Sequence, residues 1–147
     1  VVERVVVERF GGPGCPAVEI VPDNTPMGSA FSFGARVLGS RGDAVRVQGV
    51  RVMGAANTLN ISSCEISGSA GDGLVWTDDS QQQLSVSSCN LTGNAGVGIR
   101  NQTISGQLMA RDNWWGDAAG PGGLNGDGVA GNVAAAAPLA APVSLGY

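Results

Sequence analysis

The sequence contains no histidine and no lysine, and only 14% of its residues are charged. Without histidine, it lacks the side chain that most often acts as a general base near neutral pH and that most often binds zinc. Any acid–base chemistry would therefore depend on carboxylates.

The eight cationic residues are all arginine, and with 12 acidic residues they give a formal net charge of −4. This balance offers no basic stripe for a phosphate backbone, so nucleic acid is not an expected partner.

Long apolar segments are missing as well. The longest apolar stretches, such as 133–139, fall well short of the roughly 20 residues that a membrane-spanning helix needs. We therefore expect no membrane span. The chain begins at Val1 without a Met and without a charged-then-apolar leader, which favours a segment cut from a longer chain over a chain that has lost a signal peptide.

What the sequence does contain is glycine, 24 residues in a chain of 147. Many glycines and few charges are typical of a turn-rich β protein rather than a helical one. The length and the 43% hydrophobic content are sufficient for one compact core and give no reason to propose a second domain.

A ten-residue segment occurs twice. The residues at 59–68 align with those at 84–93 at a constant offset of 25, and the same offset relates Leu74 to Ile99. A third, more divergent copy begins at Leu108, 24 residues after Leu84. A recurring unit of this length indicates a repeat architecture in which each unit stacks on its neighbour.

Each copy alternates apolar and polar residues over short runs and then breaks at glycine, which predicts short strands separated by turns. A strand that recurs about every 25 residues without a helix between can stack on its own copy in the next coil, about 4.8 Å away. Upstream, Gly42–Val45 is similar to Gly71–Leu74 at an offset of 29, and 18–20 and 31–33 alternate in the same way. We expect these segments to be earlier, irregular coils.

The repeat at 59–116 resembles the right-handed parallel β-helix family of extracellular and surface proteins, with pectate-lyase-like (PbH1-type) coils. The resemblance implies an all-β, right-handed parallel β-helix of about five to six coils of about 25 residues. Residues 1–58 would form irregular coils, 59–116 the regular repeats, and 117–147 a loop-rich cap. We expect the Ala- and Pro-rich tail at 134–142 to cover the C-terminal end without continuing the ladder.

Cys64 and Cys89 occupy equivalent positions on adjacent coils, so their Cα atoms should lie about 5 Å apart, close enough for a disulfide. The alternative, which we favour, is an inward column of Cys64, Cys89 and Asn113 in which the thiols behave as small buried groups. Cys15 stays unpaired in either case.

Three asparagines fit the N-glycosylation pattern, namely Asn60, Asn90 and Asn101. The pattern is short enough to arise by chance.

Trp114 and Trp115 are adjacent, so on a strand one should face inward and the other outward. An outward indole could stack on a sugar ring, but packing of both rings beneath the terminal loop is the interpretation that we favour.

Acidic residues near turns could bind calcium or act as an acid and a base. They are Asp72, Asp78, Asp79, Asp112, Asp117 and Asp127. We favour solvated turn aspartates and expect no catalytic residue, metal or cofactor. An enzyme would need three carboxylates, or an arginine with two acids, on one outward face, and only 77–79 with Arg100 comes close. The tripeptide Arg41-Gly42-Asp43 is better explained by its turn than by adhesion.

These observations favour a non-catalytic structural component of an extracellular or cell-surface assembly, such as a fibre, an appendage or a wall. An uncovered strand at 1–10 would pair with other subunits or with the rest of a longer chain. Carbohydrate is a further candidate partner. The alternative is a fragment of a polysaccharide lyase or hydrolase, or a glycan-binding module.

Overall fold

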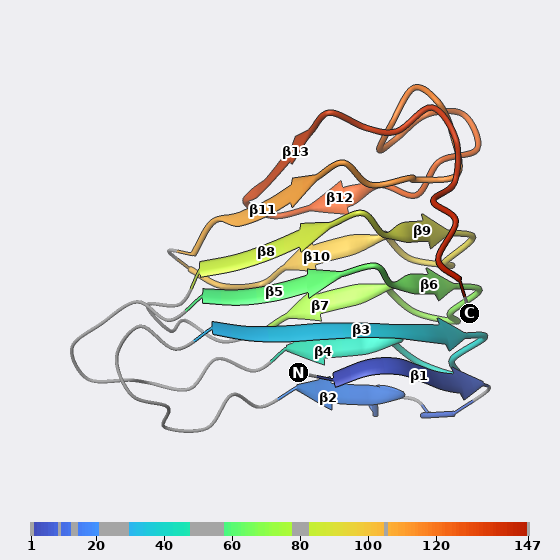
Figure 1. Cartoon of the computed structure of the whole chain (residues 1–147), viewed down its shortest axis with the longest axis vertical. Coiled ribbons are helices and arrows are strands. Elements are labelled where there is room, and N and C mark those ends of the chain that lie inside the picture. Colours follow the sequence, from blue (N-terminus) through green and yellow to red (C-terminus); the bar gives the residue numbers. More distant parts are fainter. Residues whose placement is uncertain are drawn as a thin grey trace.

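A computed structural model describes residues 2–8, 10–12, 15–20, 30–47, 58–77, 83–104 and 106–146. Over these residues the chain is all-β and contains no helix (Figure 1). None of the described segments could therefore cross a bilayer as a long apolar helix. The strands, in chain order, are β1 (Val2–Glu8), β2 (Val18–Ile20), β3 (Ala30–Leu38), β4 (Val45–Val47), β5 (Thr58–Ser62), β6 (Glu65–Ser67), β7 (Leu74–Trp76), β8 (Gln83–Ser87), β9 (Asn90–Thr92), β10 (Ile99–Asn101), β11 (Leu108–Arg111), β12 (Val129–Ala130) and β13 (Val133–Ala136).

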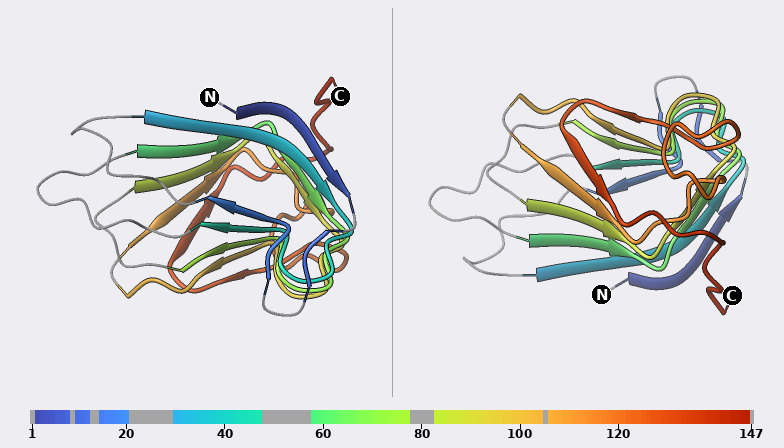
Figure 2. Two further views of the ribbon diagram at one scale, coloured as in Figure 1. Left: turned by 90° about the horizontal axis from the view of Figure 1, so that it is seen from below. Right: turned by 90° about the horizontal axis from the view of Figure 1, so that it is seen from above.

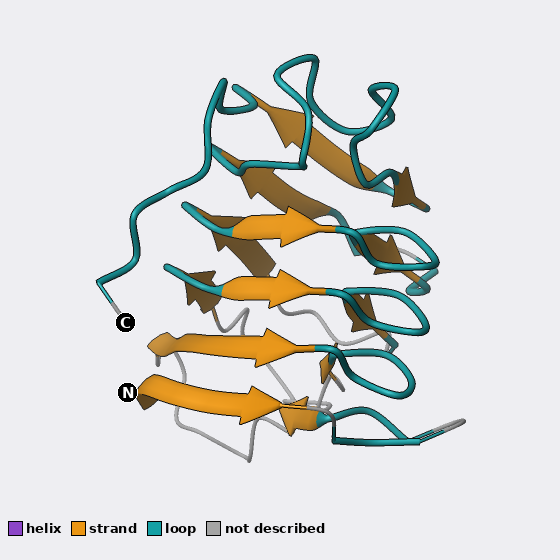
Figure 3. Cartoon of the chain, turned by 90° about the vertical axis from the view of Figure 1, so that its right-hand side faces the viewer, coloured by secondary structure: helices purple, strands orange, loops and turns teal. Residues whose placement is uncertain are grey.

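The strands stack in two parallel sheets. One sheet has eight strands in the order β13-β11-β8-β5-β3-β6-β9, with β1 also paired to β3, and the other has five in the order β12-β10-β7-β4-β2. Strands from successive coils lie one above the other along the long axis of the molecule (Figure 3). The fold is therefore a parallel β-solenoid, as the sequence predicted.

The strand register confirms the repeat. Leu59 pairs with Leu84, and Leu84 with Leu108, at the predicted offsets of 25 and 24 residues. On the second sheet, Leu74 pairs with both Val45 and Ile99, which confirms the offset of 29 in the irregular part of the chain. The two upstream segments expected to be strands form β2 and part of β3.

A sharp corner divides the first side of each regular coil from the second. It lies in the left-handed region, with φ values of 54°, 54°, 55° and 47° at Ser63, Ser88, Asp112 and Ala137. The fourth corner belongs to a further copy of the repeat in the tail, where β13 pairs with β11 from Val133 to Ala136. The expectation that 134–142 would not continue the ladder is therefore wrong for 134–136, because strand pairing uses backbone groups that alanine also supplies.

About three coils are complete, fewer than the five to six that we predicted. Strands on all sides are present in the coil of β3 and β4, the coil of β5, β6 and β7, and the coil of β8, β9 and β10. Below them, β1 pairs with β3 at Val2 and then from Val5 to Glu8. Above them, a single bridge between Asn90 and Trp114 replaces the strand that would follow β11. Non-repeating sequence at both ends thus leaves the outer rows incomplete.

The core is a set of inward columns. Alternation along each strand places one residue of every pair inside, so that Ile61, Val86 and Ala110 are fully buried in successive coils. Trp76 and Trp115 are the largest side chains that are almost entirely buried. Close packing of these columns along the axis fixes the register in which the turns, and the polar groups on them, come together.

The C-terminal end carries loops that the N-terminal end lacks among the described residues (Figures 1 and 2). The loop at 116–128 folds over the last coil, where the N–H of Asp127 donates to the carbonyl of Trp115 at 2.7 Å. Gly120 in this loop lies so close to Pro138 that a Cβ at this position would be 2.9 Å from the proline ring. Loop and tail together therefore cover part of this end.

Candidate functional site

The strongest concentration of charge on neighbouring coils lies at the turns that precede β4, β7 and β10. The N–H of Asp72 donates to Oδ1 of Asp43 at 3.0 Å, and the N–H of Val97 donates to Oδ1 of Asp72 at 2.8 Å. The turn glycines permit this approach, since a Cβ on Gly71 would lie 2.5 Å from Asp43 Oδ1. Each aspartate thus binds the backbone of the next turn.

Arg100, on β10, reaches back one coil to Asp72. Its Nε and Nη2 donate to the two carboxylate oxygens of Asp72 at 2.5 and 3.2 Å, a bidentate geometry. Desolvation acts to raise the pKa of Asp72, but the hydrogen bonds from Arg100 and Val97, with the arginine charge, outweigh it and lower the pKa. The same pair raises the pKa of Arg100, with Asp43 adding a favourable charge.

Arg100, Asp72 and Asp43 meet the criterion of an arginine with two acids across neighbouring coils. However, the Asp72 carboxylate accepts three hydrogen bonds from Arg100 and Val97, and its lowered pKa holds it ionised at neutral pH. A general acid needs a raised pKa, and a general base needs a lone pair directed at the substrate. The arrangement is therefore suited to fastening one coil to the next.

A second contact between coils is buried at the turn that follows β9 and is made by Asn94. Oδ1 of Asn94 accepts from the N–H of Ser69 at 3.1 Å, and its Nδ2 donates to Asp127 Oδ2 at 2.6 Å and to the carbonyl of Ile66 at 3.2 Å. Burial raises the pKa of Asp127, and the hydrogen bonds from Asn94 only partly offset this effect. Asn94 therefore forms hydrogen bonds both with the preceding coil and with the C-terminal loop.

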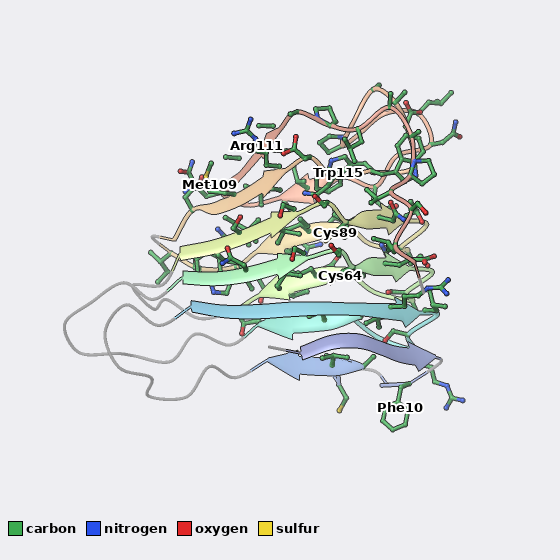
Figure 4. The ribbon with its side chains drawn as sticks, in the orientation of Figure 1. Phe10, Cys64, Cys89, Met109, Arg111 and Trp115 are labelled. Atoms are coloured by element: carbon green, nitrogen blue, oxygen red, sulfur yellow. The ribbon has the colours of Figure 1, made fainter. Side chains whose placement is uncertain are left out.

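Cys64, Cys89 and Asn113 form the inward column that the repeat predicted, and all three are fully buried. The N–H of Cys64 donates to the Sγ of Cys89 at 3.4 Å, and the N–H of Cys89 donates to Oδ1 of Asn113 at 2.9 Å. Both cysteines carry thiols, and burial raises the pKa of the Cys89 thiol well above its ordinary value. Figure 4 shows the two cysteines one above the other. A disulfide between them stays a prediction.

The three candidate glycosylation sites have different surroundings. Asn60 is half-buried on β5, whereas Asn90 and Asn101 are only 9% and 5% exposed. Nδ2 of Asn101 donates to the carbonyls of Gly106 and Asn132 at 2.7 and 2.8 Å. Nδ2 of Asn90 is also bonded, to a carbonyl of the C-terminal tail. A glycan replaces one of the two hydrogens on this nitrogen, so on Asn101 it would remove one of the two bonds, and on Asn90 it would crowd the bond to the tail.

The adjacent tryptophans separate as alternation predicts. Trp115 is 1% exposed and contributes to the core, whereas Trp114 is half-buried and pairs with Asn90. Binding of a sugar to Trp114 stays a prediction.

The remaining acidic candidates do not converge. Asp117 accepts from the N–H groups of Ala119 and Asn125 at 2.8 and 3.2 Å, bonds that shape its own loop and lower its pKa. Oδ2 of Asp112 lies 3.4 Å from Nε of the adjacent Arg111, with which it forms an ion pair. Asp78 and Asp79 lie outside the described residues. Within the ranges that the structure describes, no three His, Cys, Asp or Glu side chains are grouped as metal ligands.

One site was missed by sequence reasoning. The C-terminal tail returns along the outside of the solenoid, and Arg36 and Glu65 line a pocket of about 280 Å³ with tail residues 143–146. Nε of Arg36 donates to Glu65 Oε2 at 2.8 Å. The pairing depends on residues 29 positions apart in the irregular coil, so no local pattern could have revealed it.

No family model, no curated protein and no solved structure matches this chain. The parallel solenoid therefore rests on strand pairing alone, and membership of a pectate-lyase-like family stays a prediction.

Proposed function

We propose that this chain is a non-catalytic structural component of an extracellular or cell-surface assembly, such as a fibre, an appendage or a wall. It would join other subunits, or the rest of a longer chain, through the edges of its sheets. One observation carries the proposal: in the described part of the chain, the terminal strands β1, β2, β12 and β13 each pair with a single neighbour. Their outer edges present backbone groups that another strand can bond.

The direction of the strands suggests how copies would join. Because all paired strands are parallel, the β13 edge of one copy and the β1 edge of the next can continue the same ladder. A head-to-tail contact of this kind uses two different surfaces, so it adds copies without closing and produces a filament. The resemblance to surface β-helix proteins supports the extracellular location.

The hydrogen bonds of β13 show which residues face its outer edge. The N–H of Leu108 donates to the carbonyl of Asn132, and the N–H of Asp112 donates to that of Ala136. Even-numbered residues of β13 therefore face β11, and the N–H of Ala135 points to the open edge. Ala135→Pro removes that donor and leaves the inner ladder intact. We expect electron microscopy to show ordered polymers of the wild-type protein and markedly shorter ones for this variant.

A suitable control is Ala134→Ser, which changes a side chain on the outer face while every backbone donor remains. Its polymers should match those of the wild type. Thermal melting of the dissociated protein should give similar midpoints for both variants, which separates loss of the edge from loss of the fold. Wild-type protein that stays monomeric at every concentration would contradict the proposal.

A polysaccharide lyase or hydrolase is the second candidate, because Arg100 with Asp72 and Asp43 places an arginine and two acids on neighbouring coils, although the hydrogen bonds of Asp72 favour a structural role. Polysaccharide cleavage assays on the wild type and on Arg100→Gln test it. Cleavage that disappears in the variant, with the fold retained, would favour this activity over a structural role.

A further inference from the structure

A column of polar groups runs along the solenoid axis on the side formed by β6 and β9. Arg36 pairs in register with Glu65, Glu65 with Asn90, and Asn90 with Trp114. We call these four residues the lateral column. Each lies one coil above the last, so the column offers hydrogen-bonding groups at the spacing of parallel strands, about 4.8 Å. An extended segment running along the axis can meet one such group at each coil.

The chain's own C-terminal segment, residues 143–146, lies along this column. Nδ2 of Asn90 donates to the carbonyl of Val143 at 2.9 Å, and Oδ1 of Asn90 accepts the N–H of Val143 at 2.7 Å. One side chain thus satisfies both backbone groups of one residue. Figure 3 shows the tail descending past successive coils towards the C-terminus. Asn90 therefore binds peptide backbone through two bonds that do not involve the side chain of the bound residue.

The connection between β13 and residue 143 is weakly attached. The corners at Ser63 and Ser88 each lead into a strand, but the corner at Ala137 leads into an exposed segment with prolines at 138 and 142. Its backbone is bonded to the solenoid through the N–H of Leu139, which donates to the carbonyl of Asn113 at 2.9 Å. Such a connection can swing away from its own solenoid at little cost.

We propose that residues 143–146 of one copy bind the lateral column of a second copy, so that two copies exchange tails. The occupant fits because it is the same segment that already binds the column within one chain. Exchange of an identical element replaces each contact with an equal one and is a low-cost route to a dimer. The contact is reciprocal and closed, and it is independent of the open edges used in the proposed filament.

Two full-length variants test the exchange by complementation. Asn90→Ala disables the column but keeps a competent tail. Val143→Pro removes the N–H that Asn90 accepts, which disables the tail but keeps a competent column. Native mass spectrometry after co-refolding should show the wild-type dimer, an association weakened about ten-fold or more for either variant alone, and a 1:1 heterodimer in the mixture.

The heterodimer distinguishes tail exchange from edge pairing, because association through β1 and β13 would be the same for each variant alone and for the mixture. A mixture that shows no more association than the separate variants overturns the proposal. Circular dichroism confirms that each variant is folded, and Asn90→Ser replaces Asn90→Ala if the latter does not fold. Loss of filaments in Ala135→Pro, with the heterodimer retained, would leave this inference standing on its own.

Discussion

The side chain of Asn113 accepts a hydrogen bond from the backbone N–H of Cys89, one coil away, at 2.9 Å. Its Nδ2 also donates to the buried carbonyl of Val86. The corner at Ser88 interrupts the ladder just before Cys89, and the oxygen of the asparagine side chain supplies the partner that the N–H of Cys89 would otherwise lack.

Asn113→Ala should therefore leave the buried N–H of Cys89 without a partner and remove one bond from the carbonyl of Val86, which stays in the ladder of β8. An unsatisfied buried group costs about 1–3 kcal/mol, so we expect the free energy of unfolding to fall by a similar amount. Urea denaturation measures the change. Asn113→Cys is the matched control, because it reproduces the residue found at this position in the two preceding coils and should cost less. Equal losses for both variants would contradict the role given to the amide.

The thiols should differ in reactivity. Cys15 is exposed, whereas Cys64 and Cys89 are buried and the pKa of Cys89 is raised. A buried protonated thiol is a poor nucleophile. We expect a thiol reagent to label one cysteine in the folded protein and all three in denaturant. A single labelled cysteine in denaturant would instead reveal a disulfide between Cys64 and Cys89.

Asp72 should make the fold sensitive to acid. Its pKa is lower in the folded protein than in the unfolded chain, so its contribution is complete above the unfolded pKa near 3.8 and is lost as the pH falls through the folded value. Asp72→Asn should destabilise the protein by about 1–2 kcal/mol at pH 7, through loss of the charged bonds with Arg100. Its stability should also vary less below pH 4 than that of the wild type. Parallel acid titrations of unfolding for both proteins test this.

Asp127 should have the opposite effect. Burial raises its pKa, so its contribution is complete below the unfolded value near 3.8 and is lost as the pH rises through the folded one. Asp127→Asn removes the cost of burying the charge and can still accept from Asn94. We expect a stability at pH 7 at least equal to that of the wild type, and a flatter pH profile above the unfolded pKa near 3.8. A large loss at pH 7 would show that the negative charge itself is needed.

Glycan attachment should favour one of the three candidate asparagines. Asn60 is half-buried on a strand face, whereas the amide nitrogens of Asn90 and Asn101 are bonded within the fold. After expression in a glycosylating secretory host, mass spectrometry of peptides should find glycan at Asn60 and little at the other two. Asn60→Gln is the control and should remove the modification. Full occupancy of Asn90 would show that its amide is accessible before the tail binds.

The regular coils could be predicted because their information is local and repeated. The offset between Cys64 and Cys89 fixed both the strand register and the inward column that Asn113 continues. The turn glycines beside Asp72 revealed the same unit at Asp43, although that coil is four residues longer than the next. In each case the pattern that determines packing is also visible along the chain.

The fourth copy and the tail could not be predicted in the same way. Residues 134–136 are all alanine, so the alternation of polar and apolar residues disappears although the backbone pairing with β11 persists. The contact of Asn90 with Val143 joins residues 53 positions apart and depends on a backbone path, not on side-chain identity. The pairing of Arg100 with Asp72 could not be predicted either, because it depends on how the coils stack.

The return of the tail also changes how the molecule should unfold. Coils in a solenoid contact only their neighbours, so terminal rows can detach one after another while the middle stays folded. The bonds between Asn90 and Val143 connect the segment that follows the last row to a coil in the interior. Detachment of β13 therefore strains or breaks a contact two rows away, which couples the end of the stack to its centre. A chain with a docked tail should lose its last three rows in a single cooperative transition, and one with a released tail should fray.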